Sequence, residues 1–491
     1  MQSTVSAAPC PVADVICRTL ELGIHITGAH ITDDDITVIE ASLREPLGYC
    51  PECGAEGRLR DHVIRRLTDV PITGHPTRLH VRLPRYQCVH AQCPRTIFQH
   101  QLEAAEPGAK TTKRATTWIL KRLIQDQMSI SAISRALGLG WDLVNQLATT
   151  AAQSLVYADP THLAGVRVLG IDEHCWKHVR GQGEDSFATI FVDLTPLIDG
   201  TGRARLLDVK AGRSAKVVTS WLQERSPQFR DRVEVVTMDG FAGYHTATTN
   251  ALPDAVPVMD PFHVVQLAGQ KLTACRQRLQ QQIHGHRGRK TDLLYQGRRT
   301  LLTRRSLLNK KGRDRLERLW VEHDDHVALE VTYLVYQDVI DAYEHPDRKT
   351  GKKLMQTVIE SLRRGLPEGL EELAQLGRTL WRKRAQVLAF FDRGRASNGP
   401  VEAINGRLEH LRGIGLGFRN FGHYVLRCLL HSGQLYQPGS THSRTGRASF
   451  CTPEQIRPAY AVRPRRSARR WKPGSGSPKR CSVIEIACSC R

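Results

Sequence analysis

Three acidic residues from distant parts of the sequence have the surroundings expected of metal ligands. Asp172 follows the apolar, largely β-branched stretch Val166–Ile171, and Asp239 ends a similar stretch. Glu402 lies near the start of a helical pattern. A carboxylate at the end of a buried strand is costly unless it meets a cation. Three such groups, brought together, would hold the divalent metal ions that phosphoryl transfer uses.

Each of these residues also has a plainer interpretation. The two aspartates could cap turns at strand ends. Glu409 shares a helical face with Glu402 and is the alternative third ligand. We expect Asn398 to cap this helix, with Pro400 in its first turn.

A second set of candidate ligands consists of two cysteine pairs. Cys50 and Cys53 are separated by two residues and precede a glycine, and Cys88 and Cys93 follow after strand-like sequence. Two pairs of thiolates on tight loops are typical of a zinc ribbon, which folds because metal binding supplies the free energy that its small core lacks. Four unrelated free thiols, or a contribution from His90, remain alternatives.

The elements that must position the carboxylates alternate between strands and helices. Three consecutive strands followed by helix, strand, helix, strand and helix is the order of a ribonuclease-H-like α/β fold. Its first and fourth strands are neighbours, so Asp172 and Asp239 would meet at one edge of a cleft. The predicted strands cover residues 166–172, 188–194, 204–210, 233–239 and 255–260, and the predicted helices cover 214–224, 243–250 and a long stretch from 263.

Residues 284–395 interrupt this pattern with helices rich in Arg, Lys and Leu. We interpret them as a basic helical insertion that contacts DNA, although a solvated helical face would have the same composition. The catalytic domain would span residues 165–435. Beyond it, residues 436–491 are rich in Ser, Pro, Gly and Arg and predict a disordered basic tail.

The segment before the catalytic domain predicts two DNA-binding modules. We expect an N-terminal segment at 1–45 that supplies strands to a zinc-ribbon domain at 46–100. Residues 108–156 predict helices, with Ser129 as an N-cap and a break at Gly138. Helix, glycine turn and helix is the helix-turn-helix pattern, and a generic three-helix bundle is the alternative. The second helix should run over 141–152, and Tyr157 should begin a linker.

Composition agrees with a nucleic-acid partner. The 491 residues carry 70 Lys and Arg against 49 Asp and Glu, a formal net charge of +21. Such a balance suits a polyanionic partner: DNA, RNA or an anionic membrane surface. No apolar run is long enough to span a membrane, and the N-terminus lacks the pattern of a secretion signal. Because the chain lacks this signal, its 13 cysteines are better explained as thiols and metal ligands than as a disulfide framework.

Taken in order, these motifs resemble the ISL-three family of bacterial insertion-sequence transposases. The resemblance covers residues 45–435 and includes Gly170-Ile-Asp-Glu-His-Cys-Trp-Lys177, Met238-Asp-Gly-Phe-Ala-Gly-Tyr244, Asp260-Pro-Phe-His263 and the block around Glu402. It implies a DDE transposase with Asp172, Asp239 and Glu402 as the triad. The supporting residues would be His174, Trp176, Tyr244 and His263.

The resemblance also implies cofactors and partners. Mg²⁺, or Mn²⁺, would be held by the triad, and Zn²⁺ by the four cysteines. The partners would be double-stranded DNA, both the terminal inverted repeats of the element and the target, and further copies of the chain in a dimer or larger assembly. We expect a cytoplasmic, nucleoid-associated bacterial protein without membrane contact. A catalytically inactive repressor derived from a transposase is the alternative, and a structure-selective nuclease is a third reading.

Overall fold

The computed structural model describes residues 5–6, 11–46, 48–157, 161–178, 186–286, 288–394 and 396–434. The predicted tail at 436–491 lies outside the described residues. Within these ranges, no helix combines the length and the apolar composition that a bilayer crossing requires.

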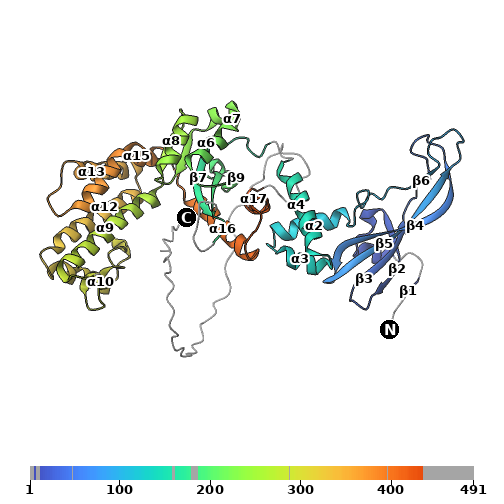
Figure 1. Ribbon diagram of the computed structural model, residues 1–491, viewed down its shortest axis with the longest axis horizontal. Coiled ribbons are helices and arrows are strands. Elements are labelled where there is room, and N and C mark those ends of the chain that lie inside the picture. Colours follow the sequence, from blue (N-terminus) through green and yellow to red (C-terminus); the bar gives the residue numbers. More distant parts are fainter. Residues whose placement is uncertain are drawn as a thin grey trace. The chain divides into compact units, whose positions relative to one another are not determined.

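The first sheet has strand order β1-β2-β3-β5-β4, and β6 pairs with β5 (Figure 1). β3 runs parallel to β5, and the other neighbouring pairs are antiparallel. The short helices α1 (Pro11–Ile16) and η1 (Leu20–Leu22) precede β2. The strands are β1 (Val5–Ser6), β2 (Ile24–Ile31), β3 (Thr37–Leu43), β4 (Gly57–Ile72), β5 (His75–Cys88) and β6 (Ile97–Gln99).

Alternation along β5 explains why this sheet has one apolar face. Leu79, Val81 and Leu83 are buried in a core with residues of β2, β3 and β4. The residues between them are mostly basic, and of these Arg82 is exposed. Since β3 is hydrogen-bonded to β5, the segment predicted at 1–45 and the cysteine-bearing segment predicted at 46–100 share one sheet.

Three helices follow this sheet: α2 (Lys113–Ile124), α3 (Ile130–Leu137) and α4 (Trp141–Tyr157). Ser129 caps α3 as expected, because its hydroxyl accepts a hydrogen bond from the Ala132 amide at 3.1 Å. Gly138 ends α3 with φ of 59°, a left-handed conformation that glycine adopts without strain. The prediction that Tyr157 begins a linker is wrong, since α4 extends to that residue. The helix continues because Ala152 and Val156 pack into the core of the next domain.

The second sheet has strand order β11-β10-β7-β8-β9 (Figure 1). β8 is antiparallel to both β7 and β9, whereas β10 and β11 continue the sheet in parallel. The strands are β7 (Val168–Cys175), β8 (Phe187–Asp193), β9 (Arg205–Ala211), β10 (Val235–Met238) and β11 (Val256–Met259). The helices that join them are α5 (Thr195–Ile198), α6 (Ala215–Gln223), α7 (Pro227–Arg232) and α8 (Ala242–Ala251).

Both faces of the second sheet are covered. Leu169 and Ile171 of β7 pack against α6, α7 and α8, whereas Val168 belongs to a separate core with α4, α16 (Gly399–Ile414) and α17 (Phe421–Ser432). This double burial explains the nearly continuous apolar sequence of the strand. β7 does not stop at Asp172 as predicted. It runs three residues further because Glu173 to Cys175 pair with β8.

The helical insertion has a core of its own, built from leucines and aromatic residues of successive helices. That core begins with α9, so the helical unit starts before the predicted boundary at residue 284. Its helices are α9 (Pro261–His284), α10 (Leu293–Gly297), η3 (Arg305–Leu307), α11 (Lys310–Val321), α12 (His326–Glu344), α13 (Arg348–Arg363), α14 (Glu371–Arg382) and α15 (Arg384–Asp392). After it, α16 returns the chain to the sheet.

Candidate active site and metal centres

The four predicted cysteine ligands come together at the open end of the β4–β5 hairpin. Their sulfur atoms all lie within 4.8 Å of one another. The Sγ atoms of Cys50 and Cys93 are 3.8 Å apart, and those of Cys53 and Cys88 are 3.5 Å apart. Zinc–sulfur bonds of about 2.3 Å separate tetrahedral sulfurs by roughly 3.8 Å, so the donor set fits Zn²⁺. His90 does not belong to this group.

The local backbone favours thiolate ligands at this site. Gly54 has φ of 71°, and its amide donates to the Cys50 carbonyl, which forms the predicted tight turn. Burial would raise the pKa of the Cys50 thiol, but hydrogen bonds from the amides of Cys53 and Glu52 lower it to about 7. Backbone amides that point at sulfur stabilise the negative charge that a zinc ligand carries.

Asp172 and Asp239 lie on neighbouring parallel strands. Thr237 of β10 pairs with Gly170 of β7, and continuing this register sets Asp239 beside Asp172. Side chains alternate along a strand, so Gly170 and Asp172 face the same side of the sheet. That side is covered by α16, which carries Glu402.

A close approach between α16 and β7 brings Glu402 towards the aspartates. A Cβ atom at Gly170 would lie 2.5 Å from Cγ2 of Val401, so only glycine allows the helix this near to the strand. Asn405, one turn after Glu402, donates from Nδ2 to Oδ2 of Asp172 at 3.0 Å and to the Glu173 carbonyl at 3.1 Å. The predicted third ligand thus lies on a helix that contacts Asp172 directly.

The electrostatics show how crowded the acidic groups are. Burial, with smaller contributions from the charges of Asp239 and Glu402, raises the pKa of Asp172 to about 7, although the Glu173 amide and His263 oppose the shift. Burial also raises the pKa of Glu402, with a contribution from Asp260. Burial and neighbouring negative charges disfavour the ionised form of these carboxylates. A bound cation would favour the ionised form, so the group is suited to bind cations.

Asp260 and His263 also belong to this site. Ligand atoms of Asp260, His263 and Glu402 lie within 4.8 Å of one another. Burial would lower the pKa of His263, but the interaction with Asp260 and the charges of Asp172 and Asp239 raise it. The surrounding carboxylates therefore favour the protonated form of the His263 imidazole.

Asp172, Asp239 and Glu402 do not form a comparable group within 4.8 Å among the described residues. A two-metal site does not require one, because its two ions are about 3.5–4 Å apart and each outer carboxylate binds a different ion. The alternative ligand Glu409 instead forms ion pairs with Arg412 and, at 3.5 Å, with His178. Arg412 lowers the pKa of Glu409, which is the opposite of the shift at Glu402.

Three of the predicted supporting residues are packed in the interior. His174 stacks on Tyr424, and burial lowers the pKa of His174 to about 4. Trp176 makes an edge contact with Phe421. Tyr244 is fully buried, and its hydroxyl lies 3.2 Å from the Thr189 hydroxyl. Their positions stabilise the elements around the carboxylates.

The sequence prediction missed Lys383. This residue lies between α14 and α15, and its Nζ atom donates to the Gly240 carbonyl, next to Asp239. Burial lowers the pKa of Lys383, and the charge of Asp239 opposes that shift. Lys383 lies 143 positions after Gly240 in the sequence, so no local pattern could have predicted their contact. The chain brings Lys383 to the site only where it returns from the helical insertion.

Comparison with known proteins identifies the family. A family model described as "Transposase", for the DDE domain of ISL3 elements, matches residues 169–428. The chain belongs to the ISL3 family of transposases. A "zinc-finger of transposase IS204/IS1001/IS1096/IS1165" matches residues 46–93, and a "Helix-turn-helix domain of transposase family ISL3" matches residues 101–152. These matches confirm the family resemblance and its order of zinc-finger, helix-turn-helix and transposase segments.

A curated relative agrees with this assignment. The transposase for insertion sequence element IS1001 of Bordetella parapertussis is 26% identical over 227 residues, which are 45% of this chain and 50% of that protein. The chain therefore matches half the length of this relative.

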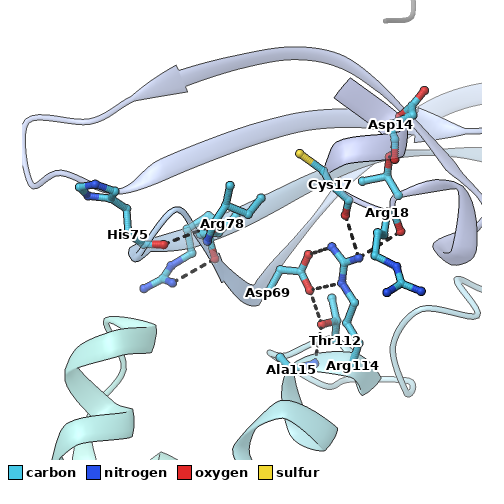
Figure 2. Close-up of polar contacts among 12 residues, drawn as sticks. Asp14, Cys17, Arg18, Asp69, His75, Arg78, Thr112, Arg114 and Ala115 are labelled. Carbon is cyan, nitrogen blue, oxygen red and sulfur yellow. Dashed lines mark hydrogen bonds and ion pairs between the residues drawn. The ribbon is translucent and has the colours of Figure 1, made fainter. Parts of the chain in front are cut away.

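In this ISL3 transposase, polar contacts join the first sheet to the helix-turn-helix (Figure 2). The buried carboxylate of Asp69 on β4 accepts hydrogen bonds from the Thr112 hydroxyl at 2.7 Å and from Arg114 Nε at 2.8 Å. Arg114 also donates to the carbonyls of Cys17 and Arg18. Arg78 of β5 donates to two carbonyls at the end of α3, those of Leu137 and Gly138. The two modules are thereby held as one body.

Several side chains of this body are exposed and accessible to a partner. On α4, the second helix of the helix-turn-helix, Trp141 is 48% exposed, and Asp142 and Gln146 are exposed one turn apart. On the hairpin, Arg66 and Arg82 are exposed on the face opposite the apolar core. Basic side chains at such positions suit contacts with DNA phosphates.

Proposed function

We propose that this chain is a DNA transposase that binds the terminal inverted repeats of its insertion sequence and catalyses metal-dependent strand cleavage and strand transfer. One observation carries the proposal. Asp172 and Asp239 continue a single register on neighbouring strands, and α16 lies against that edge with Glu402. The strand order, with β8 antiparallel between β7 and β9, supports a ribonuclease-H-like fold for this domain.

The donor set fits Mg²⁺ or Mn²⁺, because carboxylate oxygens are the ligands that hard divalent cations prefer. Asp172, Asp239 and Glu402 would hold two such ions. When bound, the ions lower the pKa of the attacking water or 3′-hydroxyl and stabilise the oxygen that leaves phosphorus during in-line displacement.

The chain's own residues prepare this chemistry. Asn405 fixes the Asp172 carboxylate, since it donates to Oδ2 while the Glu173 amide donates to Oδ1. Asp260 and the charges of Asp172 and Asp239 favour a proton on His263, and a proton held there would offset part of the repulsion among the carboxylates. Lys383 adds a positive charge beside Asp239.

The other modules would supply recognition. Zn²⁺ bound by Cys50, Cys53, Cys88 and Cys93 would close the end of the hairpin, and α4 would enter the major groove of the repeat. Paired element ends are the substrate of transposition, so we propose that two or more copies assemble on DNA.

Cleavage of a labelled element end in Mg²⁺ tests the proposal. We expect the parent protein to nick at the end of the repeat, and Asp172→Asn, Asp239→Asn and Glu402→Gln to bind the repeat but not nick it. Glu409→Gln is the matched control and should retain nicking. Nicking by the Asp172→Asn protein at the parent rate would contradict the site. Binding without nicking by the parent itself would instead favour a repressor.

A further inference from the structure

Asn398 immediately precedes α16 as its N-cap residue, but its side chain does not cap the helix. Asparagine at this position normally accepts a hydrogen bond from an amide of the first turn. Asn398 is the N-cap residue, as predicted from the sequence, but its side chain makes no such bond. Asn398 is instead completely buried, although it is polar. Its side chain must therefore have other partners.

Those partners lie on three neighbouring strands. Asn398 Nδ2 donates to the Ile171 carbonyl of β7 at 3.3 Å. Its Oδ1 accepts from the Thr237 hydroxyl of β10 at 2.9 Å. Its backbone amide donates to Oδ1 of Asp260, which follows β11, at 2.6 Å. One residue thus bridges the middle of β7, the end of β10 and the residue that follows β11.

Each contact is close in sequence to an acidic group of the site. Ile171 immediately precedes Asp172, and Thr237 lies two residues before Asp239. The Asn398 carbonyl accepts from the Glu402 amide at 3.0 Å, which places Glu402 one helical turn further along. Asn398 therefore contacts Ile171 and Thr237, which are close in sequence to the two aspartates. It also begins the helical turn that carries Glu402.

Two separate features then fix α16 on the sheet. The contact between Gly170 and Val401 sets how near the helix comes to β7. Close packing alone would still allow the helix to slide or rotate. Directional hydrogen bonds from Asn398 to three strands remove that freedom, because sliding would leave buried polar groups without partners.

We propose that Asn398 is a positioning residue that sets the register of α16 on the sheet and thereby holds Glu402 at metal-binding distance from Asp172 and Asp239. This inference rests on the proposed function, since it assumes that Glu402 is a metal ligand. Loss of a group that orients a metal ligand typically weakens metal binding about 10–100-fold.

Binding of Mn²⁺ to the zinc-loaded, DNA-free protein tests the inference without reference to activity. Free Mn²⁺ is followed by electron paramagnetic resonance for the parent, Asn398→Ala, Glu402→Gln and the double variant. We expect Asn398→Ala and Glu402→Gln each to weaken binding about 10–100-fold. In the Glu402→Gln background, Asn398→Ala should have no further effect, because it acts through the glutamate.

Matched variants separate positioning from folding. Asn420→Ala removes the cap of α17 in the same domain, where Oδ1 accepts from the His423 amide at 3.0 Å, and should leave Mn²⁺ binding unchanged. Thr237→Val removes only the hydroxyl that contacts Asn398 and should weaken binding, whereas Thr237→Ser keeps that hydroxyl and should restore it. The threonine pair carries the test if Asn398→Ala unfolds.

The outcomes are distinguishable. Equal Mn²⁺ binding by the parent and Glu402→Gln would reject Glu402 as a ligand and with it the proposed site. If Glu402→Gln weakens binding but neither Asn398→Ala nor Thr237→Val does, the positioning role is overturned. It is also overturned if Asn398→Ala weakens binding equally in the Glu402→Gln background, because a general structural defect would have that effect.

Discussion

At the scale of single residues, Asp172 carries the clearest electrostatic signature. Its carboxyl group is buried against two other acidic side chains, which raises its pKa to about 7 from an ordinary value of 3.8. The raised pKa means that the folded protein binds this proton more tightly than the unfolded chain does. Ionising Asp172 therefore costs stability unless a metal ion is bound.

Replacing Asp172 with Asn should stabilise the metal-free protein above neutral pH. Below pH 4 the carboxyl is protonated in both states, so the substitution changes little. Between pH 4 and 7 only the unfolded chain ionises, and the parent loses stability on the order of 2–4 kcal/mol. Urea unfolding in EDTA at pH 4 and pH 8 measures this difference. The exposed Asp231→Asn is the matched control, and an advantage of Asp172→Asn at pH 4 alone would contradict the prediction.

The sequence allowed some of these residues to be predicted and concealed others. Asp172 and Asp239 follow apolar runs, and that local signal was enough to propose them; their role as ligands stays a prediction. Asn398 was expected to be a cap because asparagine is common there. Its contacts with Ile171, Thr237 and Asp260 involve residues 227, 161 and 138 positions away, which no local pattern encodes.

At the scale of elements, the packing of α16 on β7 depends on the absence of one side chain. Gly170 lies in the middle of a strand, where glycine is normally unfavourable. Its position is explained by Val401, whose Cγ2 would lie 2.5 Å from an added Cβ. β-Branched valine has little freedom to move away.

Gly170→Ala should therefore destabilise the domain by about 1–3 kcal/mol through overpacking. Gly406→Ala lies on α16 itself, where nothing is within 4 Å of the added Cβ, and should stabilise by up to about 1 kcal/mol. Urea unfolding of both variants compares the two signs. Adding Val401→Ala should relieve part of the Gly170→Ala defect, and equal losses in both glycine variants would refute this account.

The cysteine cluster gives a second prediction at this scale. We expect one zinc ion per chain, released by chelator after thiol modification and absent from Cys53→Ser. Without metal, the bonds after Arg58 and Arg95, which lie next to the two cysteine loops, should become sensitive to trypsin, because metal binding rather than a large core holds these loops. Cys175→Ser, in the second sheet, should retain the zinc and resist trypsin as the parent does. If the zinc-depleted protein also resisted trypsin, the end of the hairpin would be stable without bound metal.

Element types were easier to predict from the sequence than element ends. Ser129 and Gly138 mark the limits of α3 because capping and left-handed backbone are local properties. The ends of β7 and α4 depend on distant partners: β8 extends the strand to Cys175, and the core of the second sheet extends the helix to Tyr157. Tertiary contacts set those limits, so local patterns could not.

At the scale of the whole molecule, the first sheet and the helix-turn-helix are joined rather than strung together. The joint depends on Asp69, which is fully buried and paired with Arg114, whose side chain is only 20% exposed. Parallel pairing of β3 with β5, and antiparallel pairing of β2 with β3, also make β2 and β3 part of this body. The domain limits proposed from the sequence remain predictions. Composition alone could not have shown that β3 and the cysteine-bearing hairpin belong to the same sheet.

Asp69→Ala should loosen this joint by leaving a largely buried guanidinium without its partner, at a cost of about 3–5 kcal/mol. Asp61→Ala, which breaks the pair with Arg85 on the same sheet, should cost much less than Asp69→Ala, because solvent screens that pair. Circular dichroism during urea unfolding of the full chain reports both. Similar midpoints for the two variants would mean that the Asp69 contacts do not hold the modules together.

The return of the chain at Asn398 has a consequence for biosynthesis. The Asp260 carboxylate accepts its hydrogen bond from the amide of Asn398, which is synthesised 138 residues later. At about 5–20 residues per second, a ribosome needs roughly 7–30 seconds to make that interval. A nascent polypeptide holding both aspartates would lack the glutamate throughout, so cleavage would begin only after nearly all of the protein has been translated.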